Sequence, residues 1–249
     1  MKLGQINEAI DIFTQMKIVG LDPNTVTYTT HISGLSQNGH NSEALTYFKQ
    51  LFQAGYRPNS ASIVAALSAS TNMVSLHEGR AIHVYIVRKN ILLSLPVATA
   101  LVDMYAKYEN GCAVEALALF KCLSGGGMEP DNITFTGVLS SCCHAGLLKE
   151  GLDVLYDMLY VYLMKPSVEH YGCMITLLSM CGNLDEAMQL IQSMPYKPEA
   201  NVFESLFVAC RELREAELEE YIDNYLIKME PDDSGHYVSL SNAYATSGR

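Results

Sequence analysis

The sequence predicts an all-α fold, a right-handed superhelical solenoid of helix-turn-helix repeats. The first observation is that the pattern of GLDPNTVTYTTHI, residues 20–32, returns 107 residues later as GMEPDNITFTGVL, with glycine, proline, a small polar residue, Val or Ile, Thr, an aromatic residue and Thr in the same order. The second is that a small residue preceded by glutamate returns in steps of 35, 35, 37, 35 and 36 residues, at Ala9, Ala44, Gly79, Ala116, Gly151 and Ala187. Self-similarity at such a period is typical of repeat architectures, in which stacked units share one continuous core.

Each unit is expected to form two helices. In residues 25–59 two helix-spaced apolar stripes are predicted, one of Val26, Tyr28, Ile32 and Leu35 and one of Ala44, Leu45, Phe48 and Leu51. Between the stripes, Gly39 is expected to end the first helix and Ser42 to cap the second. The small residue at each register position, such as Ala44, should let the two helices approach closely.

This register divides the chain into units. Residues 1–24 are a partial repeat holding only a second helix, and five full repeats follow at 25–59, 60–94, 95–131, 132–167 and 168–199. A divergent unit at 200–233 has Glu219 in place of the small residue, and 234–249 matches the first helix of another. Unit 95–131 is the longest, and its surplus is predicted to lie between Tyr108 and Val114. The exposed repeat ends favour self-association as a homodimer.

Composition narrows the function classes. No segment approaches the roughly 18 uncharged apolar residues that cross a membrane, so no membrane partner is expected. Met1 opens onto polar, helix-like sequence, so a transit peptide is predicted to be absent from this chain. Seven cysteines without a CxxC pair favour a reducing compartment and predict neither metal nor cofactor. The net charge of −11 argues against nucleic-acid binding, because contact with phosphate usually requires a basic face, but −7 of this charge lies in residues 200–233.

The residues NTVTYTTHISGLSQNGHNSEALTYFKQLFQAGYRPN resemble a pentatricopeptide repeat, abbreviated PPR. The likeness extends to the plant PLS class, because IVAALSAS and LHEGRAIHVYIVRKN are similar to its long flavour and ATALVDMYAKY to its short flavour. Residues 200–233 and 234–249 look like a first and a truncated second E motif. The HxE and CxxC motifs of the DYW deaminase domain that can follow them are not found, which implies that this chain is not an enzyme.

The resemblance implies single-stranded RNA binding with one base per repeat. In such repeats the second residue clamps the base, while the fifth and last residues hydrogen-bond its edge. The clamps would be Val26, Pro96 and Ile133. The base-reading pairs would be Thr29 with Asn59, Thr99 with Asp131, and Thr136 with Ser167. The first pair resembles the adenine code and the second the guanine code, whereas Val64 with Ser94 and Gly172 with Glu199 fit neither.

Structural interpretations compete with these roles. Asn24, Asn59, Ser94, Asp131 and Ser167 each stand before a predicted helix, where Asn, Asp and Ser are preferred N-caps. Val26 and Ile133 could belong to the core instead of contacting a base. Cys142, Cys143 and His144 are adjacent on one predicted helix and are better explained as buried cysteines than as metal ligands.

The resulting hypothesis is a site-recognition factor for C-to-U RNA editing in a plant chloroplast or mitochondrion. Residues 200–249 would then contact a deaminase or another editing-factor protein. One alternative is an RNA-binding splicing or stability factor. The other is a helical-repeat scaffold for protein–protein interaction, to which the negative charge points.

Overall fold

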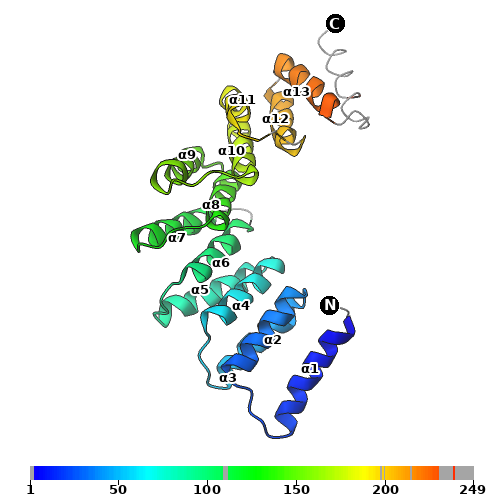
Figure 1. Cartoon of the computed structure of the whole chain (residues 1–249), viewed down its shortest axis with the longest axis vertical. Helices are drawn as coiled ribbons and strands as arrows, with labels where there is room; N and C mark the ends of the chain where they lie inside the picture. Colours follow the sequence, from blue (N-terminus) through cyan, green and yellow to red (C-terminus); the bar gives the residue numbers. More distant parts are fainter. Residues whose placement is uncertain are drawn as a thin grey trace. The chain divides into compact units, whose positions relative to one another are not determined.

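The computed structural model describes residues 3–108, 112–196, 198, 200–213, 215–229 and 238. Over these residues the chain is all helical and contains no strand, which confirms the predicted fold class. It divides into two compact units, residues 1–137 and 138–249, which are described separately. Figure 1 shows the helix hairpins of each unit. Residues 109–111 of the predicted longer loop, and most of residues 230–249, lie outside the described part.

Unit 1 consists of consecutive helix hairpins. Its helices are α1 (Leu3–Ile18), α2 (Thr25–Gln37), α3 (Asn41–Gln53), α4 (Ser60–Asn72), α5 (Leu76–Arg88), α6 (Leu95–Ala106), α7 (Ala113–Gly125) and the beginning of α8 (Asn132–Ala145). The hairpins are α2 with α3, α4 with α5, and α6 with α7, and the first helices also pack on one another, α2 on α4 and α4 on α6. The repeated contact explains the period: each first helix buries one face on its partner and another on the next hairpin.

The small register residues lie where helices are closest. Ala44 and Ala116 are fully buried. At Gly79 of α5, a Cβ atom would stand 2.6 Å from Sδ of Met104 on α6, which is shorter than any normal contact. A larger side chain at the register position would therefore have to displace the packed Met104 side chain or widen the helix contact, which favours a small residue there.

Two predictions of detail were wrong. Gly39 does end α2, with φ of +81°, but α3 begins at Asn41 with His40 as its N-cap, so Ser42 lies inside the helix. Tyr28, Ile32 and Leu35 are buried as predicted, whereas Val26 is 68% exposed. Val26 and Tyr28 cannot share a face, because residues two apart on a helix point in nearly opposite directions.

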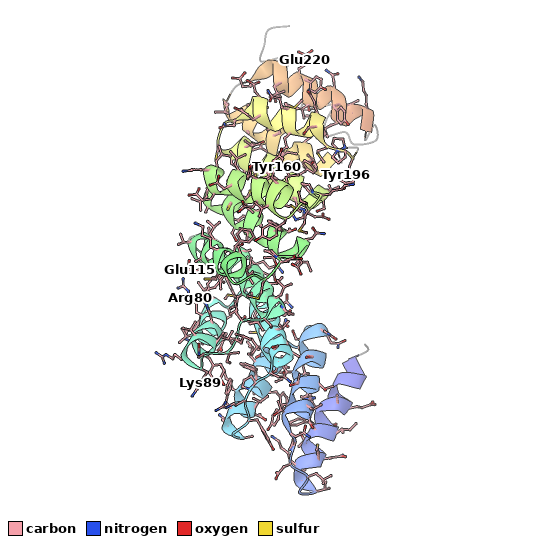
Figure 2. All side chains as sticks on the ribbon, turned by 60° about the vertical axis from the view of Figure 1, so that its left-hand side comes forward. Arg80, Lys89, Glu115, Tyr160, Tyr196 and Glu220 are labelled. Carbon is pink, nitrogen blue, oxygen red and sulfur yellow. The ribbon has the colours of Figure 1, made fainter. Side chains whose placement is uncertain are left out.

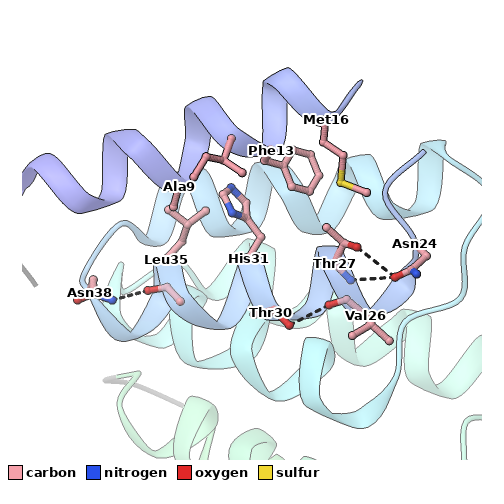
Figure 3. Close-up of a pocket in the computed structure, with 12 residues that line it drawn as sticks. Ala9, Phe13, Met16, Asn24, Val26, Thr27, Thr30, His31, Leu35 and Asn38 are labelled. Carbon is pink, nitrogen blue, oxygen red and sulfur yellow. Dashed lines mark hydrogen bonds between the residues drawn. The ribbon is translucent and has the colours of Figure 1, made fainter. Parts of the chain in front are cut away.

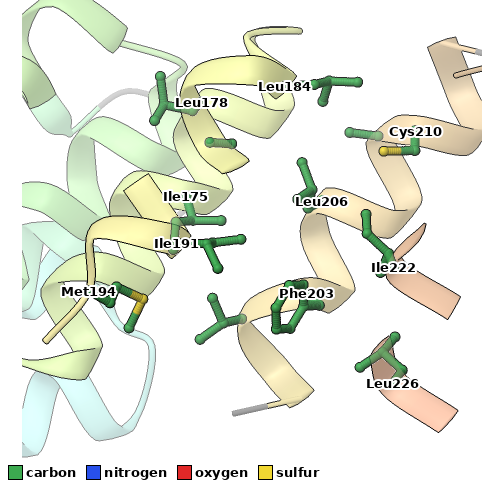
Figure 4. Packing of buried hydrophobic residues seen from close by; sticks show 13 residues of the cluster. Ile175, Leu178, Leu184, Ile191, Met194, Phe203, Leu206, Cys210, Ile222 and Leu226 are labelled. Atoms are coloured by element: carbon green, nitrogen blue, oxygen red, sulfur yellow. The ribbon is translucent and has the colours of Figure 1, made fainter. Parts of the chain in front are cut away.

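Unit 2 contains the rest of α8, then α9 (Leu148–Tyr156), α10 (Val168–Met180), α11 (Leu184–Ser193), α12 (Ala200–Leu213) and α13 (Ala216–Met229). Its core joins α10 to α13 through a buried cluster in which Phe203 and Leu206 of α12 lie between Ile191 of α11 and Ile222 of α13 (Figure 4). Because Phe203 is almost completely buried, this cluster is the anchor of the C-terminal hairpin.

A π-helix, η1 (Asp157–Val161), continues α9. Its widened turn is closed by the Tyr162 amide, which donates to the Asp157 carbonyl five residues earlier at 2.9 Å. A π-turn accommodates one extra residue in a helix. This agrees with the step of 36 residues from Gly151 to Ala187, one more than the commonest step.

The cysteines are free thiols with contrasting accessibility. Cys142 and Cys143 are buried, as the sequence predicted, while His144 beside them is exposed. No group of three His, Cys, Asp or Glu side chains that could hold a metal occurs among the described residues. Nor is any described helix both long and apolar enough to cross a membrane.

We expect thiol alkylation to follow burial. Burial raises the pKa of Cys142 to about 12 and that of Cys210 to about 12, so both remain protonated at pH 8, and only thiolates alkylate rapidly. Iodoacetamide at pH 8 should label the exposed Cys122 and Cys181 first and reach Cys142 and Cys210 only in denaturant. Peptide mass spectrometry measures the order, and early labelling of Cys142 in the folded chain would contradict the burial described here.

Candidate nucleic-acid interface

The candidate base-reading residues stand at the N-termini of the first helices. The side-chain oxygens of Asn24, Asn59 and Asp131 accept from the backbone amides of Thr27, Ser62 and Thr134, at 3.0, 2.9 and 2.8 Å. The N-cap interpretation therefore holds for these three residues. In each case one side-chain oxygen is occupied by the capping hydrogen bond, so only the remaining polar atoms of that side chain can bind a ligand.

The pair Thr29 and Asn59 comes together in the structure. Thr29 is half-buried on α2, Asn59 is exposed before α4, and Thr29 Oγ1 lies 3.3 Å from Asn59 Oδ1. Thr29 Oγ1 also lies 2.7 Å from the carbonyl oxygen of Thr25, one turn earlier. Asn59 Oδ1 is occupied by the Ser62 amide, which leaves the two Nδ2 hydrogens of Asn59 as the donors of this pair.

The pair Thr99 and Asp131 is joined through a third residue. Thr99 Oγ1 is 2.8 Å from Thr134 Oγ1, and Thr134 Oγ1 donates to Asp131 Oδ1 at 2.7 Å. Thr134 was not among the predicted site residues. A sequence signal for it exists, because Thr27, Ser62 and Thr134 are all hydroxyl residues three positions after a capping side chain, as in a capping box.

A cavity of about 400 Å³ joins this pair to two of the predicted clamps. Its lining consists of Val64, Ser68, Leu95, Pro96, Thr99, Ala100, Asp103, Asp131 and Ile133. Pro96 and Ile133 are exposed at the first turns of α6 and α8, and Ile133 is 64% accessible to solvent. Apolar side chains of successive repeats thus line one cavity together with the polar side chains of Ser68, Thr99, Asp103 and Asp131. Apolar surface beside polar groups is the combination that suits a planar base.

The predicted clamp Val26 lines a different cavity, of about 600 Å³, between α1 and α2 (Figure 3). Here the ring of His31 stacks on Phe13 with centroids 4.7 Å apart, and its Nε2 is buried without a hydrogen-bond partner among the described residues. Burial lowers the pKa of His31, which keeps its ring neutral at pH 7. His31 was not among the predicted site residues, since an isolated histidine on a helix carries no distinguishing signal in the sequence.

The third pair falls in two separately described units. Thr136 of unit 1 donates to the Asn132 carbonyl at 2.9 Å. Ser167 of unit 2 precedes α10, and its backbone amide donates to Nδ1 of His170 at 2.9 Å. Ser94, by contrast, makes no capping bond and lies 3.5 Å from Ser60 Oγ. Thr136 and Ser167 thus keep the predicted helix-terminal positions.

Basic residues of unit 1 occur both inside and outside ion pairs. Lys49 binds Glu78 on the neighbouring second helix at 2.9 Å. Arg80 likewise binds Glu115 at 3.1 Å, and Figure 2 labels both residues. Such exposed pairs contribute little to stability. The exposed Arg57, Arg88 and Lys89 form no ion pair with any described residue, so they retain charge for an anionic partner.

Comparison with known proteins identifies the repeats. A model described as PPR repeat family matches residues 1–37, and a PPR repeat model matches residues 26–56, 133–160 and 169–197. A chloroplastic pentatricopeptide repeat-containing protein of Arabidopsis thaliana is 40% identical over 74% of this chain and 26% of its own length. A mitochondrial one from the same plant is 34% identical over 99% of this chain and 43% of its own length.

Solved structures agree on the fold. The maize pentatricopeptide repeat protein PPR10 superposes with a TM-score of 0.65 at 18% identity, over 99% of this chain and 40% of that chain. The PPR domain of the Arabidopsis thaliana protein-only RNase P 1, solved with tRNA, gives 0.60 at 14% identity, over 72% of this chain and 95% of that domain. The chain spans less than half the length of the relatives above. It carries pentatricopeptide repeats and is a homologue of the plant pentatricopeptide repeat proteins.

Proposed function

We propose that this chain binds single-stranded RNA and pairs one base with each repeat. The observation that carries the proposal is the cavity in which Pro96 and Ile133 lie beside Thr99 and Asp131. The contact between Thr29 on α2 and Asn59 before α4 supports a second base-binding position of the same kind. PPR10, which has the same fold, was solved in complex with an 18-nucleotide psaJ RNA element.

The finer assignment is a non-catalytic site-recognition factor for C-to-U editing in a plant organelle. It rests on the resemblance of the repeats to the PLS class and of residues 200–249 to E motifs. Arabidopsis homologues that are chloroplastic or mitochondrial support the organelle. Residues 200–249 would recruit a deaminase or another editing-factor protein. Splicing or transcript stabilisation would use the same repeats without that recruitment.

One observation favours a second function, docking of proteins. Asp185, Glu186 and Glu215 line a cavity of about 650 Å³ between α11 and α13, at the acidic end of the chain. Phosphate would be repelled there, whereas a basic protein segment would be attracted. A homodimer through the repeat ends would use the cavity between α1 and α2 instead.

RNA binding is tested by fluorescence anisotropy with labelled oligouridine octamers that carry two purines separated by one nucleotide. That spacing places one purine in the slot of Thr29 and Asn59 and the other in the slot of Thr99 and Asp131. We expect adenine to be preferred in the first slot and guanine in the second. Affinity should fall as salt rises, because each neutralised phosphate contributes roughly −0.7 to the slope of log K against log salt.

The control is heparin, a polyanion without bases. Heparin should compete with the RNA at low salt, and it should compete equally against every octamer, whichever purines that octamer carries. Affinity that is equal at 50 and 300 mM salt, or equal for every octamer, would contradict the recognition of one base by each repeat. If no RNA binds and a basic protein does, the protein-docking function takes its place.

A further inference from the structure

We propose that Thr134 is a positioning residue that makes the Thr99/Asp131 pair selective for guanine. The proposal rests on the proposed RNA-binding function and deepens it. Thr134 belongs to α8, the first helix of the next repeat, and it is fully buried. It cannot reach a base itself, so any effect on specificity must pass through Thr99 and Asp131.

The first step is the direction of the hydrogen bonds. Ionised aspartate only accepts, so in the 2.7 Å contact with Asp131 Oδ1 the Thr134 hydroxyl must donate its single hydrogen. In the 2.8 Å contact with Thr99 it can then only accept. Thr99 must therefore donate to Thr134, and the chain of bonds runs from Thr99 through Thr134 to Asp131.

The second step is what remains for a base. With its hydrogen turned toward Thr134, Thr99 offers only lone pairs to the cavity. Asp131 uses Oδ1 for the amide and hydroxyl of Thr134, which leaves Oδ2 as a further acceptor. The pair therefore presents acceptors alone. Guanine matches them with the N1–H and N2–H₂ donors of its Watson–Crick edge, whereas adenine offers an acceptor at N1 and a donor at N6.

The Thr29/Asn59 pair shows that this arrangement is not a general consequence of capping. Ser62, at the position equivalent to Thr134, binds the backbone of Asn59, accepting from its amide at 3.0 Å and donating to its carbonyl at 2.9 Å. It makes no side-chain bridge, and Thr29 approaches Asn59 Oδ1 directly. There the Asn59 amide hydrogens remain as donors beside the Thr29 lone pairs, an arrangement complementary to adenine.

The test compares Thr134→Val with Thr134→Ser. Valine has the shape of threonine without the hydroxyl, and its backbone amide can still cap through Asp131, so folding should be kept. In the valine variant Thr99 is free to donate into the cavity, and the preference for guanine over adenine in that slot should fall about tenfold, the cost of one unsatisfied edge. The serine variant should retain the preference, and both should keep the preference for adenine in the Thr29/Asn59 slot.

Ser62→Ala is the matched control, because it removes a hydroxyl at the equivalent position without a bridge to lose. It should leave base selectivity in its own slot unchanged. If Thr134→Val does not fold, as judged by circular dichroism, Thr134→Ala removes the same hydroxyl with a smaller side chain and should give the same loss. Full guanine preference in a folded valine variant overturns the role of Thr134. Absence of any base preference in the wild-type chain overturns the proposed function itself.

Discussion

Replacing Ala44 by phenylalanine should destabilise unit 1 by about 3 kcal/mol, the upper end of the cost of overpacking a core. Ala44 is fully buried on α3, which packs against both α2 and α4. A benzyl group there has no space unless two interfaces open together. The loss should appear as a fall of roughly 5–10 °C in the midpoint of thermal unfolding followed by circular dichroism.

Ala81→Phe supplies the control, because Ala81 is exposed on α5 and the same atoms are added to a helix without meeting a neighbour. Its unfolding midpoint should stay within about 2 °C of the wild type, as surface substitutions usually do. Equal midpoints for the two variants would mean that the register position does not control the approach of the helices.

The sequence predicted the parts of the fold that repeat. The spacing of Ala44, Gly79 and Ala116 carries the packing constraint of one hairpin into the next, so the same small residue appears wherever two helices are closest. Burial of Leu51 and Leu123, each seven residues after a register position, follows from the same periodicity. Because the same position recurs in every repeat, the pattern can be compared across repeats. A single helix offers no such comparison.

The predictions that were wrong concern where a helix begins, which depends on the backbone conformation of one or two residues. Ser42 and His40 are both near a glycine turn, and nothing in the residue types decides at which of them the helix begins. The π-helix after α9 was visible only as a step of 36, which does not say where the extra residue is inserted. Register patterns locate elements to within a residue or two, and capping geometry decides the rest.

The candidate site was predictable as a set of positions and not as a set of bonds. Thr99 and Asp131 were placed by their repeat positions, and the structure brings both to one cavity. That their connection passes through Thr134 could not be foreseen, because it depends on where the hydroxyl of the following repeat lies to within a few tenths of an ångström. Thr29 and Asn59, at the same repeat positions, are joined directly.

Changing Asn59 to aspartate should convert the first slot from adenine to guanine preference. The substitution replaces the Nδ2 donor by an acceptor oxygen, while the other oxygen can still cap α4 through the Ser62 amide at 2.9 Å. The slot then holds only acceptors once Thr29 donates to the new carboxylate, the arrangement that Thr99 and Asp131 already have. A base whose edge is fully hydrogen-bonded is favoured over a base with an unsatisfied edge by about 1–3 kcal/mol. This corresponds to roughly tenfold to hundredfold discrimination between guanine and adenine.

The charge of the new carboxylate must be separated from its effect on the base edge. Asn24→Asp adds the same charge at the same kind of N-cap, but Asn24 has no partner equivalent to Thr29 within residues 1–24. It should weaken all octamers alike in the anisotropy titration, since a carboxylate near phosphates repels every sequence. If Asn59→Asp does the same and leaves the ratio of adenine to guanine affinity unchanged, Asn59 is an N-cap alone and the one-base-per-repeat model fails for this unit.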